Sequence, residues 1–279
     1  MTARNDSKLK WLERELPEGL IVTAAWLTEH GFSTSLRSQY VKAGWLEQPA
    51  RGVYRRPRGR LRWEQVVIAL QTLLEFPVLI GGRTALELQG YGHFLSQDQR
   101  EVHLYVKQAL PGWINKLKLP QHFVFHNSAR LFGTDPLARG LPGLDGTDKS
   151  NQKSSDPHHG SVTILPWGQW DWPLAVSAPE RALLELLDEL PDRESFHLVD
   201  KLAEGLVSLS PRRLQPLLED CTSIKVKRLF FFFADRHKPT WLKRIDRTRV
   251  DLGKGDRMLV RGGRFDSVHR ITVPEDLDA

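Results

Sequence analysis

The sequence has a single cysteine, Cys221, so an internal disulfide and a cysteine-based zinc site are both excluded. It also lacks a run of about 18 apolar residues, which a membrane-spanning helix requires. Its longest apolar run is only Leu229 to Ala234. Residues 1–10 are polar and lack the apolar core of a signal peptide. These absences predict a cytoplasmic protein without a membrane partner.

Positive charge is concentrated in two parts of the chain. Residues 1–62 hold 12 Lys and Arg against 6 Asp and Glu, and residues 225–270 hold 14 against 5. The formal charge of the whole chain is only +6, so the remainder is acidic. A basic segment favours a polyanionic partner, because neutralising phosphates releases their counterions. Charge alone is equally consistent with a solvated basic surface.

Helical periodicity followed by a hairpin predicts a winged helix-turn-helix domain over residues 1–62. Thr23 and Ser33 can cap its second and third helices. Gly44 can end the third helix, because glycine readily adopts the left-handed conformation found there. The predicted bounds are 8–16, 24–30 and 34–43 for the helices and 45–47 and 52–55 for the strands, around a turn at 49–51.

Residues 63–279 are predicted to form a larger mixed α/β domain, which makes the protein α+β with two domains. Capping boxes are predicted at Thr84–Glu87 and Ser177–Glu180, each opening a helix. Residues 133–160 are rich in Gly, Pro, Asp and Ser and predict a long mobile loop. Residues 225–274 predict strands and turns, with Leu229 to Ala234 as a buried strand. Other predicted helices are 63–75, 181–189, 196–207 and one beginning at 210–211; other predicted strands are 77–80, 101–106, 122–125 and 161–165.

The third helix has the polar composition of a recognition helix. Such a helix lies in the major groove, where each base pair presents a distinct pattern of donors and acceptors. Arg37 suits a guanine edge and Gln39 an adenine, whereas Ser35 and Lys42 suit phosphates. The basic track continues through Arg58, Arg60 and Arg62. The predicted DNA-binding residues are Ser33, Thr34, Ser35, Arg37, Ser38, Gln39, Lys42, Arg51, Tyr54, Arg55 and Arg56. The alternative is a small helical domain whose wing packs on the larger domain.

A second basic surface is predicted near the C-terminus, where Trp241 and Phe265 stand among cationic residues. Basic groups with interspersed aromatic rings suit a nucleic acid, and RNA is the candidate partner here. An outward strand face with alternating charge is an equally good interpretation. The predicted residues are Lys225, Lys227, Arg228, Lys243, Arg244, Arg247, Arg261 and Arg264.

Several segments resemble AbiEi-type antitoxins, the transcriptional regulators of type IV toxin–antitoxin systems. Val41–Leu46 followed by Arg51–Tyr54 is similar to the N-terminal winged helix of that family. Leu79–His93, Val176–Leu186 and Val226–Phe230 resemble its second domain. The resemblance implies binding to inverted repeats in the protein's own promoter and repression of the operon. It also implies that the second domain counters a nucleotidyltransferase-like toxin without a stable complex.

An enzymatic interpretation rests on Ile80–Gly82, which resembles the glycine pair of nucleotidyltransferase active sites. Such sites hold metal ions on paired carboxylates. At the corresponding strand this sequence has Glu101 and His103, so a histidine replaces the second acid. The adjacent pair His158–His159 cannot point at one metal from a regular strand. We therefore expect no catalysis, metal or cofactor. The alternatives are an enzyme that processes nucleic acid or nucleotides, and a protein that only binds a protein partner.

Overall fold

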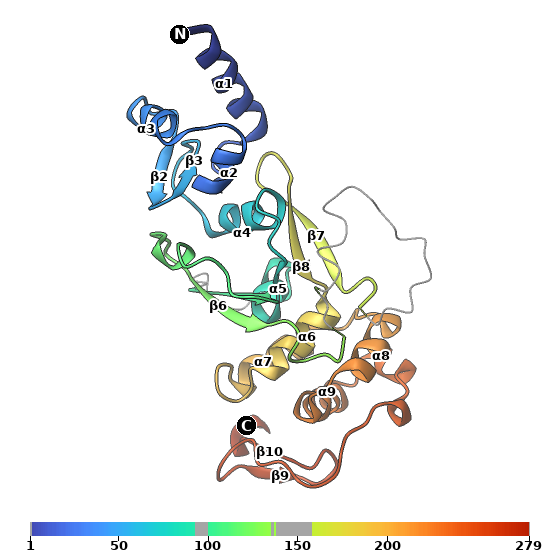
Figure 1. Ribbon diagram of the computed structural model, residues 1–279. Helices are drawn as coiled ribbons and strands as arrows, with labels where there is room; N and C mark the ends of the chain where they lie inside the picture. The colour runs from blue at the N-terminus through green and yellow to red at the C-terminus, as the bar shows by residue number, and fades with distance from the viewer. Residues whose placement is uncertain (1, 93–99, 135–136, 138–157, 279) are drawn as a thin grey trace.

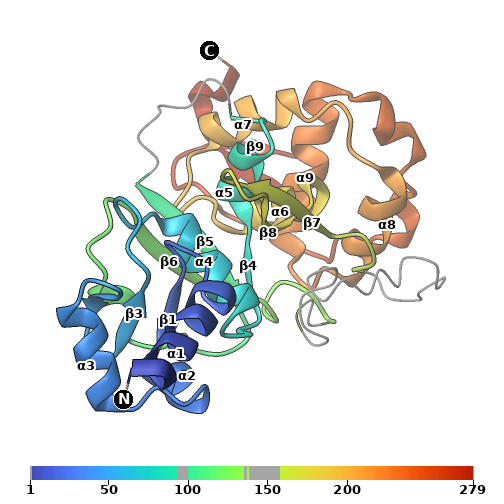
Figure 2. The same cartoon turned by 90° about the horizontal axis from the view of Figure 1, so that it is seen from above.

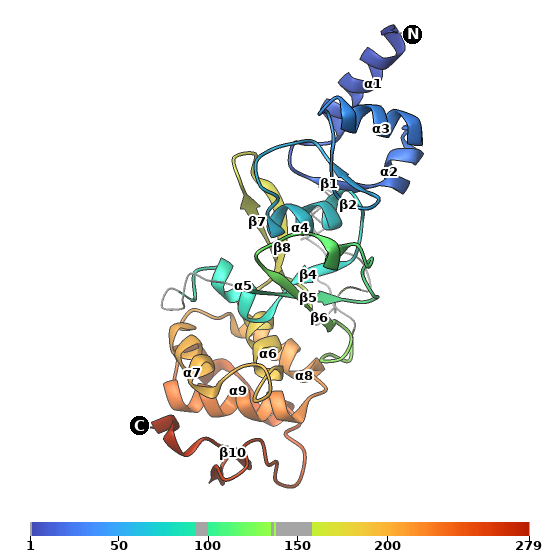
Figure 3. The same cartoon turned by 90° about the vertical axis from the view of Figure 1, so that its left-hand side faces the viewer.

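The structure is a computed structural model that describes residues 2–92, 100–134, 137 and 158–278 (Figure 1). Most of the loop predicted over 133–160 therefore lies outside the described residues. The winged-helix elements occupy one end of the molecule, a sheet lies in the middle, and helices α6–α9 with a small hairpin form the other end (Figures 1 and 3). Among the described residues, no helix combines the length and apolar character that a bilayer crossing requires.

The first six elements form a helix–strand–helix–helix–hairpin unit. They are α1 (Thr2–Glu15), β1 (Ile21–Thr23), α2 (Ala24–Glu29), α3 (Thr34–Lys42), β2 (Glu47–Ala50) and β3 (Val53–Arg55). The three strands form an antiparallel sheet in the order β1-β3-β2. This topology is compatible with the predicted winged helix-turn-helix. The sequence had not predicted β1.

Local sequence explains where these helices begin. Thr23 accepts a hydrogen bond from the Trp26 amide at 3.1 Å, and Ser33 accepts one from the Leu36 amide at 3.3 Å, which confirms both predicted caps. The hairpin turn lies at residues 51–52 rather than 49–51. Pro49 belongs to β2, and it fits there because β2 is an edge strand that can lack one amide donor.

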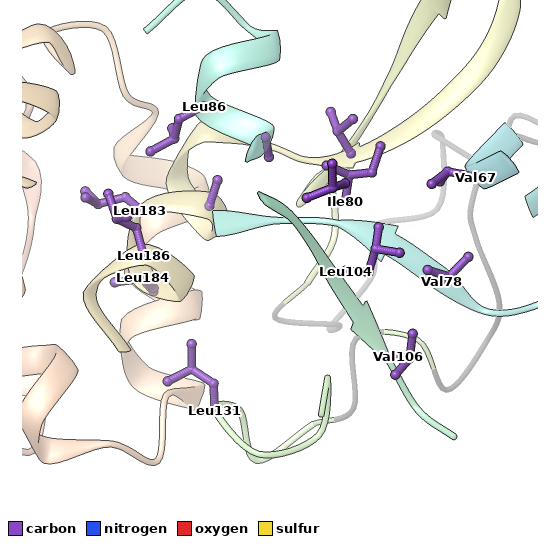
Figure 4. Packing of buried hydrophobic residues seen from close by; sticks show 14 of the residues in the cluster. Val67, Val78, Ile80, Leu86, Leu104, Val106, Leu131, Leu183, Leu184 and Leu186 are labelled. Carbon is purple, nitrogen blue, oxygen red and sulfur yellow. The ribbon is translucent and has the colours of Figure 1, made fainter. Parts of the chain in front are cut away.

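The second part of the chain is built on a five-stranded mixed sheet in the order β6-β5-β4-β8-β7. The strands are β4 (Val78–Ile80), β5 (Glu101–Val106), β6 (His122–Asn127), β7 (Val162–Trp167) and β8 (Trp172–Ser177). Strand pairs β5–β6 and β4–β8 are parallel, whereas β4–β5 and β7–β8 are antiparallel. Apolar side chains of the sheet pack with those of α4, α5 and α6 in one core (Figure 4).

Six helices and a hairpin surround this sheet. The helices are α4 (Trp63–Thr72), α5 (Gly82–Leu88), α6 (Pro179–Asp188), α7 (Phe196–Gly205), α8 (Pro211–Asp220) and α9 (Ile224–His237). The hairpin pairs β9 (Arg264–Asp266) with β10 (Ile271–Val273), and short 3-10 turns are η1 (Ile114–Lys116), η2 (Thr240–Arg244), η3 (Arg247–Arg249) and η4 (Glu275–Asp278). Seen from above, α6, α7, α8 and α9 gather on the side of the sheet away from the winged helix (Figure 2).

The buried strand predicted at Leu229–Ala234 is wrong, because these residues lie in the middle of helix α9. Four consecutive phenylalanines suit a helix only if it is covered on all sides, and α9 is covered in this way. Phe230 packs on Trp241, Phe231 under the Arg247 guanidinium, Phe232 on His269 and Phe233 on Phe196. Each ring thus has its own neighbour, which a period-based prediction cannot foresee.

Both predicted capping boxes are also wrong. Helix α5 begins at Gly82, two residues before Thr84, and the Thr84 hydroxyl instead accepts the His103 amide of β5 at 3.0 Å. Helix α6 follows Ala178, which has no capping side chain. Glu180 instead accepts the Ser210 amide at 2.6 Å and joins the start of α8 to α6.

Helix α4 connects the two parts of the molecule. It contacts β1 of the winged helix on one side and β8 of the large sheet on the other. The Gln71 side chain exchanges hydrogen bonds with the backbone of Ala175 and donates to the Val78 carbonyl. The β7–β8 hairpin reaches the same junction, since Arg62 lies 5.0 Å from the centre of the Trp167 ring. Its tip rises beside α4 in Figures 1 and 3.

Candidate nucleic-acid interface

One face of α3 is polar and exposed. Ser35, Ser38, Gln39 and Lys42 are spaced by three or four residues, so their side chains share one side of the helix. Ser35 contacts the Ser33 hydroxyl at 3.0 Å. The side chains of Ser38, Gln39 and Lys42 make no hydrogen bond or ion pair with any residue that the structure describes. This face carries unsatisfied donors and acceptors on a rigid element, as a base-reading surface requires.

Arg37 points inward, although the sequence predicts that it contacts a guanine. Its side chain is buried, with 7% exposure. The guanidinium donates to the Phe32 carbonyl at 2.7 Å, the Ala24 carbonyl at 3.3 Å, the Thr28 hydroxyl at 2.7 Å and the Thr34 hydroxyl at 3.0 Å. Arg37 therefore ties α3 to α2 and to the turn between them. A charge held in this way cannot also reach a base edge.

The wing exposes less charge than its sequence predicts. Arg51, at the hairpin tip, is exposed and has no partner among the described residues. Arg55 is buried and pairs with Glu47 at 2.6 Å. Arg56 is half-buried and donates to the carbonyls of Glu13 and Leu16, both at 3.0 Å. Arg55 and Arg56 thus stabilise the domain.

The remaining predicted DNA-binding residues are Tyr54, Ser33 and Thr34. Tyr54 is half-buried, with its ring 5.9 Å from the Arg37 guanidinium carbon. Ser33 and Thr34 are exposed at the start of α3, where Ser33 caps the helix and Thr34 accepts from Arg37. Backbone amides at a helix start suit phosphates. These residues therefore lie at an edge of the exposed face of α3.

A groove of about 730 Å³ runs beside the linker that follows the wing. Arg60, Arg62 and Lys118 line it, together with Glu64, which Arg62 pairs at 2.7 Å. Arg60 and Lys118 are exposed and have no partner among the described residues. Lys118 comes from the segment before β6, far away in sequence, so no local pattern indicates that it joins this basic track.

Half of the predicted second basic surface is occupied by internal contacts. Lys225 donates to two carbonyls at the end of α6, Lys227 is buried, and Arg247 pairs with Asp235. Arg228 donates to the carbonyls of Leu252 at 2.7 Å, Gly253 at 3.2 Å, Gly255 at 2.7 Å and Arg270 at 3.1 Å. It thereby holds the C-terminal segment against α9. Lys243, Arg244, Arg261 and Arg264 are exposed, and Arg247 is exposed as well despite its ion pair.

Two family models match almost the whole chain. The model described as "Transcriptional regulator, AbiEi antitoxin N-terminal domain" matches residues 5–97. The model described as "Transcriptional regulator, AbiEi antitoxin, Type IV TA system" matches residues 99–274. The chain belongs to the AbiEi family. The family resemblance inferred from the sequence is thus confirmed, and the protein is a transcriptional regulator and antitoxin of type IV systems by family.

A solved structure gives a second comparison. The RV2827C protein from Mycobacterium tuberculosis shares the fold with a TM-score of 0.56 and 15% sequence identity, over 96% of this chain and 90% of that chain. At this identity the likeness concerns the fold alone. A search of curated proteins gives no significant match.

Gly81 and Gly82 of this AbiEi protein are enclosed by helix α6, which begins within Val176–Leu186, one of the segments that resemble the family. The Gly82 amide donates to one carboxylate oxygen of Glu185 at 2.9 Å, and the Arg181 Nε donates to the other at 2.7 Å. A Cβ at Gly81 would overlap Glu185 and the Tyr105 ring. Gly81 is therefore needed for close packing against Glu185 of α6 and Tyr105 of β5. Gly82 has a φ of 52°, a conformation that glycine adopts without strain.

A polar cluster lies beside the glycine pair in the AbiEi fold. His103 of β5 and His126 of β6 share a hydrogen bond of 3.0 Å between Nδ1 and Nε2. His126 Nδ1 lies 3.1 Å from Glu189, the C-cap residue of α6. Burial and the neighbouring His126 lower the pKa of His103 to about 4, so its imidazole is neutral at pH 7. The sequence pairs His103 with Glu101 only, because His126 is 23 residues away.

The pKa values of Glu189 and Glu194 are shifted in opposite directions in this cluster. Burial favours protonation of Glu189, but the hydrogen bond from His126 and the electrostatic attraction of His126 and Arg193 together outweigh burial and lower the pKa of Glu189. Burial raises the pKa of Glu194 to about 7, despite the nearby Arg83, and the surrounding carboxylates add to this effect. Arg83 Nη1 lies 3.8 Å from Glu194.

Proposed function

We propose that this AbiEi-family protein represses its own toxin–antitoxin operon by binding inverted repeats in the promoter. The exposed face of α3, formed by Ser35, Ser38, Gln39 and Lys42, carries the proposal. Gln39 can pair with an adenine edge, and Lys42 can neutralise a phosphate. Arg51 at the wing tip adds a second phosphate contact. In this assignment Arg37 and Arg55 act by holding the domain together.

The larger domain would act as the antitoxin against a nucleotidyltransferase-like toxin, without forming a stable complex. Support comes from the family membership, whose type IV antitoxins this chain matches over both parts. The enzymatic alternative has no support in the geometry, since β5 offers Glu101 and His103 rather than two acids and Gly81 is enclosed. The exposed cations Lys243 and Arg264 remain candidates for an RNA contact.

Operator binding tests the first half of the proposal. The full-length protein is titrated onto its own upstream DNA and onto a scrambled duplex over a salt series. The proposal predicts preference for the native sequence and a steep loss of affinity with salt. Gln39→Ala should weaken native-sequence binding by about 1–3 kcal/mol if Gln39 makes a bidentate base contact. Lys42→Ala should instead reduce the salt slope by about 0.9, the value of one phosphate contact.

Lys201→Ala is the matched control, because Lys201 is an exposed lysine on α7, away from α3. Equal affinity for both duplexes, or equal losses in Lys201→Ala and Lys42→Ala, would show that α3 is not the reading helix.

Co-expression with the toxin tests the antitoxin function separately from operator binding. A Gln39→Ala, Lys42→Ala double variant should lose repression and still rescue growth. Loss of rescue with repression intact would contradict the division of roles.

A further inference from the structure

His103, His126 and Glu189 bring three metal-ligand atoms together from three elements. One ligand atom from each residue lies within 4.8 Å of the others. His103 is 2% exposed, and the side chains of His126 and Glu189 are about 9% and 10% exposed. Strand pairing of β5 with β6 fixes the two histidines, and α6 ends at the third residue. The fold therefore presents these groups together.

The distances are close to those of a coordination shell. Two ligands of a tetrahedral zinc ion, each about 2.0–2.1 Å from the metal, lie about 3.3 Å apart. His103 Nδ1 and His126 Nε2 are 3.0 Å apart, and their rings are inclined by only 8°. The hydrogen bond between them holds one proton. A divalent ion bound to both nitrogens would take its place, and the proton would move to the other nitrogen of its ring, as the second tautomer of a neutral imidazole. Glu189 contacts His126 Nδ1, the nitrogen of that ring that faces away from His103, so its carboxylate would have to turn to reach the same ion.

Neighbouring charges suit the outer shell of such a centre. Ligating histidines usually direct their second nitrogen at a carboxylate or carbonyl. His103 Nε2 lies 3.9 Å from Glu101, and Arg193 lies 3.7 Å from the second oxygen of Glu189. Glu101 is further oriented by His122, which contacts it at 2.9 Å. The ligand set of two imidazoles and a carboxylate has the composition of zinc sites that keep a fourth position for water.

We propose that His103, His126 and Glu189 bind one zinc-class divalent ion, which joins strands β5 and β6 to the end of α6. The inference goes beyond the proposed function, and it corrects the expectation of no metal that rested on His158–His159. His158 is instead engaged with Asp220 at 3.1 Å. His126 follows His103 by 23 residues, and Glu189 follows His126 by 63 residues. The three residues therefore form no sequence motif, and only the fold reveals the cluster.

Metal titration of the untagged full-length protein tests the proposal, since a polyhistidine tag would itself bind metal. The protein is stripped with a chelator and titrated with Zn²⁺ by calorimetry in two buffers, and separately with Co²⁺ by visible absorption. The expected results are a stoichiometry of one and cobalt bands of a four-coordinate site. His126→Gln should weaken Zn²⁺ binding by at least about tenfold.

His159→Gln is the matched control, because His159 is an exposed histidine that makes no contact with the cluster among the described residues. It should bind Zn²⁺ as the wild type does. Circular dichroism checks folding, and Glu189→Gln replaces His126→Gln if the latter does not fold. Absence of saturable binding with a stoichiometry of one would overturn the proposal. Equal losses in His159→Gln and His126→Gln, or no loss in His126→Gln and Glu189→Gln, would also overturn it.

Discussion

Replacing Arg37 should cost stability rather than a base contact. Arg37→Met keeps much of the aliphatic volume but removes four donated hydrogen bonds, two to carbonyls and two to hydroxyls. A hydrogen bond from a charged donor contributes about 1.5–3 kcal/mol, and bonds that share one guanidinium are not additive. The acceptors left behind are partly buried. We therefore expect the variant to lose about 2–4 kcal/mol of unfolding free energy.

Denaturant unfolding followed by circular dichroism measures this loss, with Gln39→Ala as the control on the same helix. Gln39 is exposed and unpartnered among the described residues, so its removal should change stability by less than about 0.5 kcal/mol. Operator binding is measured for both variants under conditions where each is folded. Unchanged stability in Arg37→Met together with lost operator binding would refute the reasoning, because Arg37 would then be a reading residue.

Three further perturbations follow from buried contacts. Glu194→Gln should remove part of the pH dependence of the unfolding free energy. The native Glu194 carboxyl has a pKa of about 7 and keeps a proton that the unfolded chain releases above about 4.5, so wild-type stability falls as the pH rises from about 4.5 to about 7. Free energies of unfolding from urea titrations at pH 5 and 8 should therefore differ by about 2 kcal/mol more in the wild type than in the variant, and equal differences would contradict the assignment. Gly81→Ala should lower the melting temperature, because its Cβ would overlap Glu185 and Tyr105; an unchanged melting curve would show that β4 and α6 can separate without penalty. Arg228→Met should destabilise by about 2–4 kcal/mol through four lost carbonyl contacts, whereas Lys243→Ala should be neutral, and thermal unfolding of both variants distinguishes a structural from a surface role.

Local sequence predicted the start of a helix well where a single capping residue determines it. Ser33 and Thr23 cap their helices as expected, since a hydroxyl three residues before an amide needs no tertiary partner. Strand β5 has the bounds predicted from its alternation. The capping box at Thr84 failed because the hydroxyl had a competing acceptor role toward His103, on a strand that sequence alone does not bring close.

Residue type predicted that α3 carries an exposed polar face better than it predicted which side chains lie on that face. Arginine in a recognition helix suggests base contact, yet Arg37 lies on the side of α3 that faces α2. Whether such an arginine faces DNA or the protein interior depends on which side of the helix it occupies relative to α2. Amino-acid composition does not contain this information. Lys118 illustrates the converse, because its position beside Arg60 depends on the chain path between β5 and β6.

The shared core changes how the predicted boundary at residue 62 should be understood. Helix α4 begins at Trp63, and its buried side chains belong to the same apolar cluster as Ile21 of the winged helix and Val176 of the large sheet. The family's N-terminal model likewise continues to residue 97. A helix packed on both sides transmits orientation between its neighbours, because its buried contacts cannot slide without loss of packing. The exposed face of α3 and the larger domain are thus held in a defined geometry. Under the proposed function, α4 rather than a flexible linker would determine where the larger domain lies beside a bound operator.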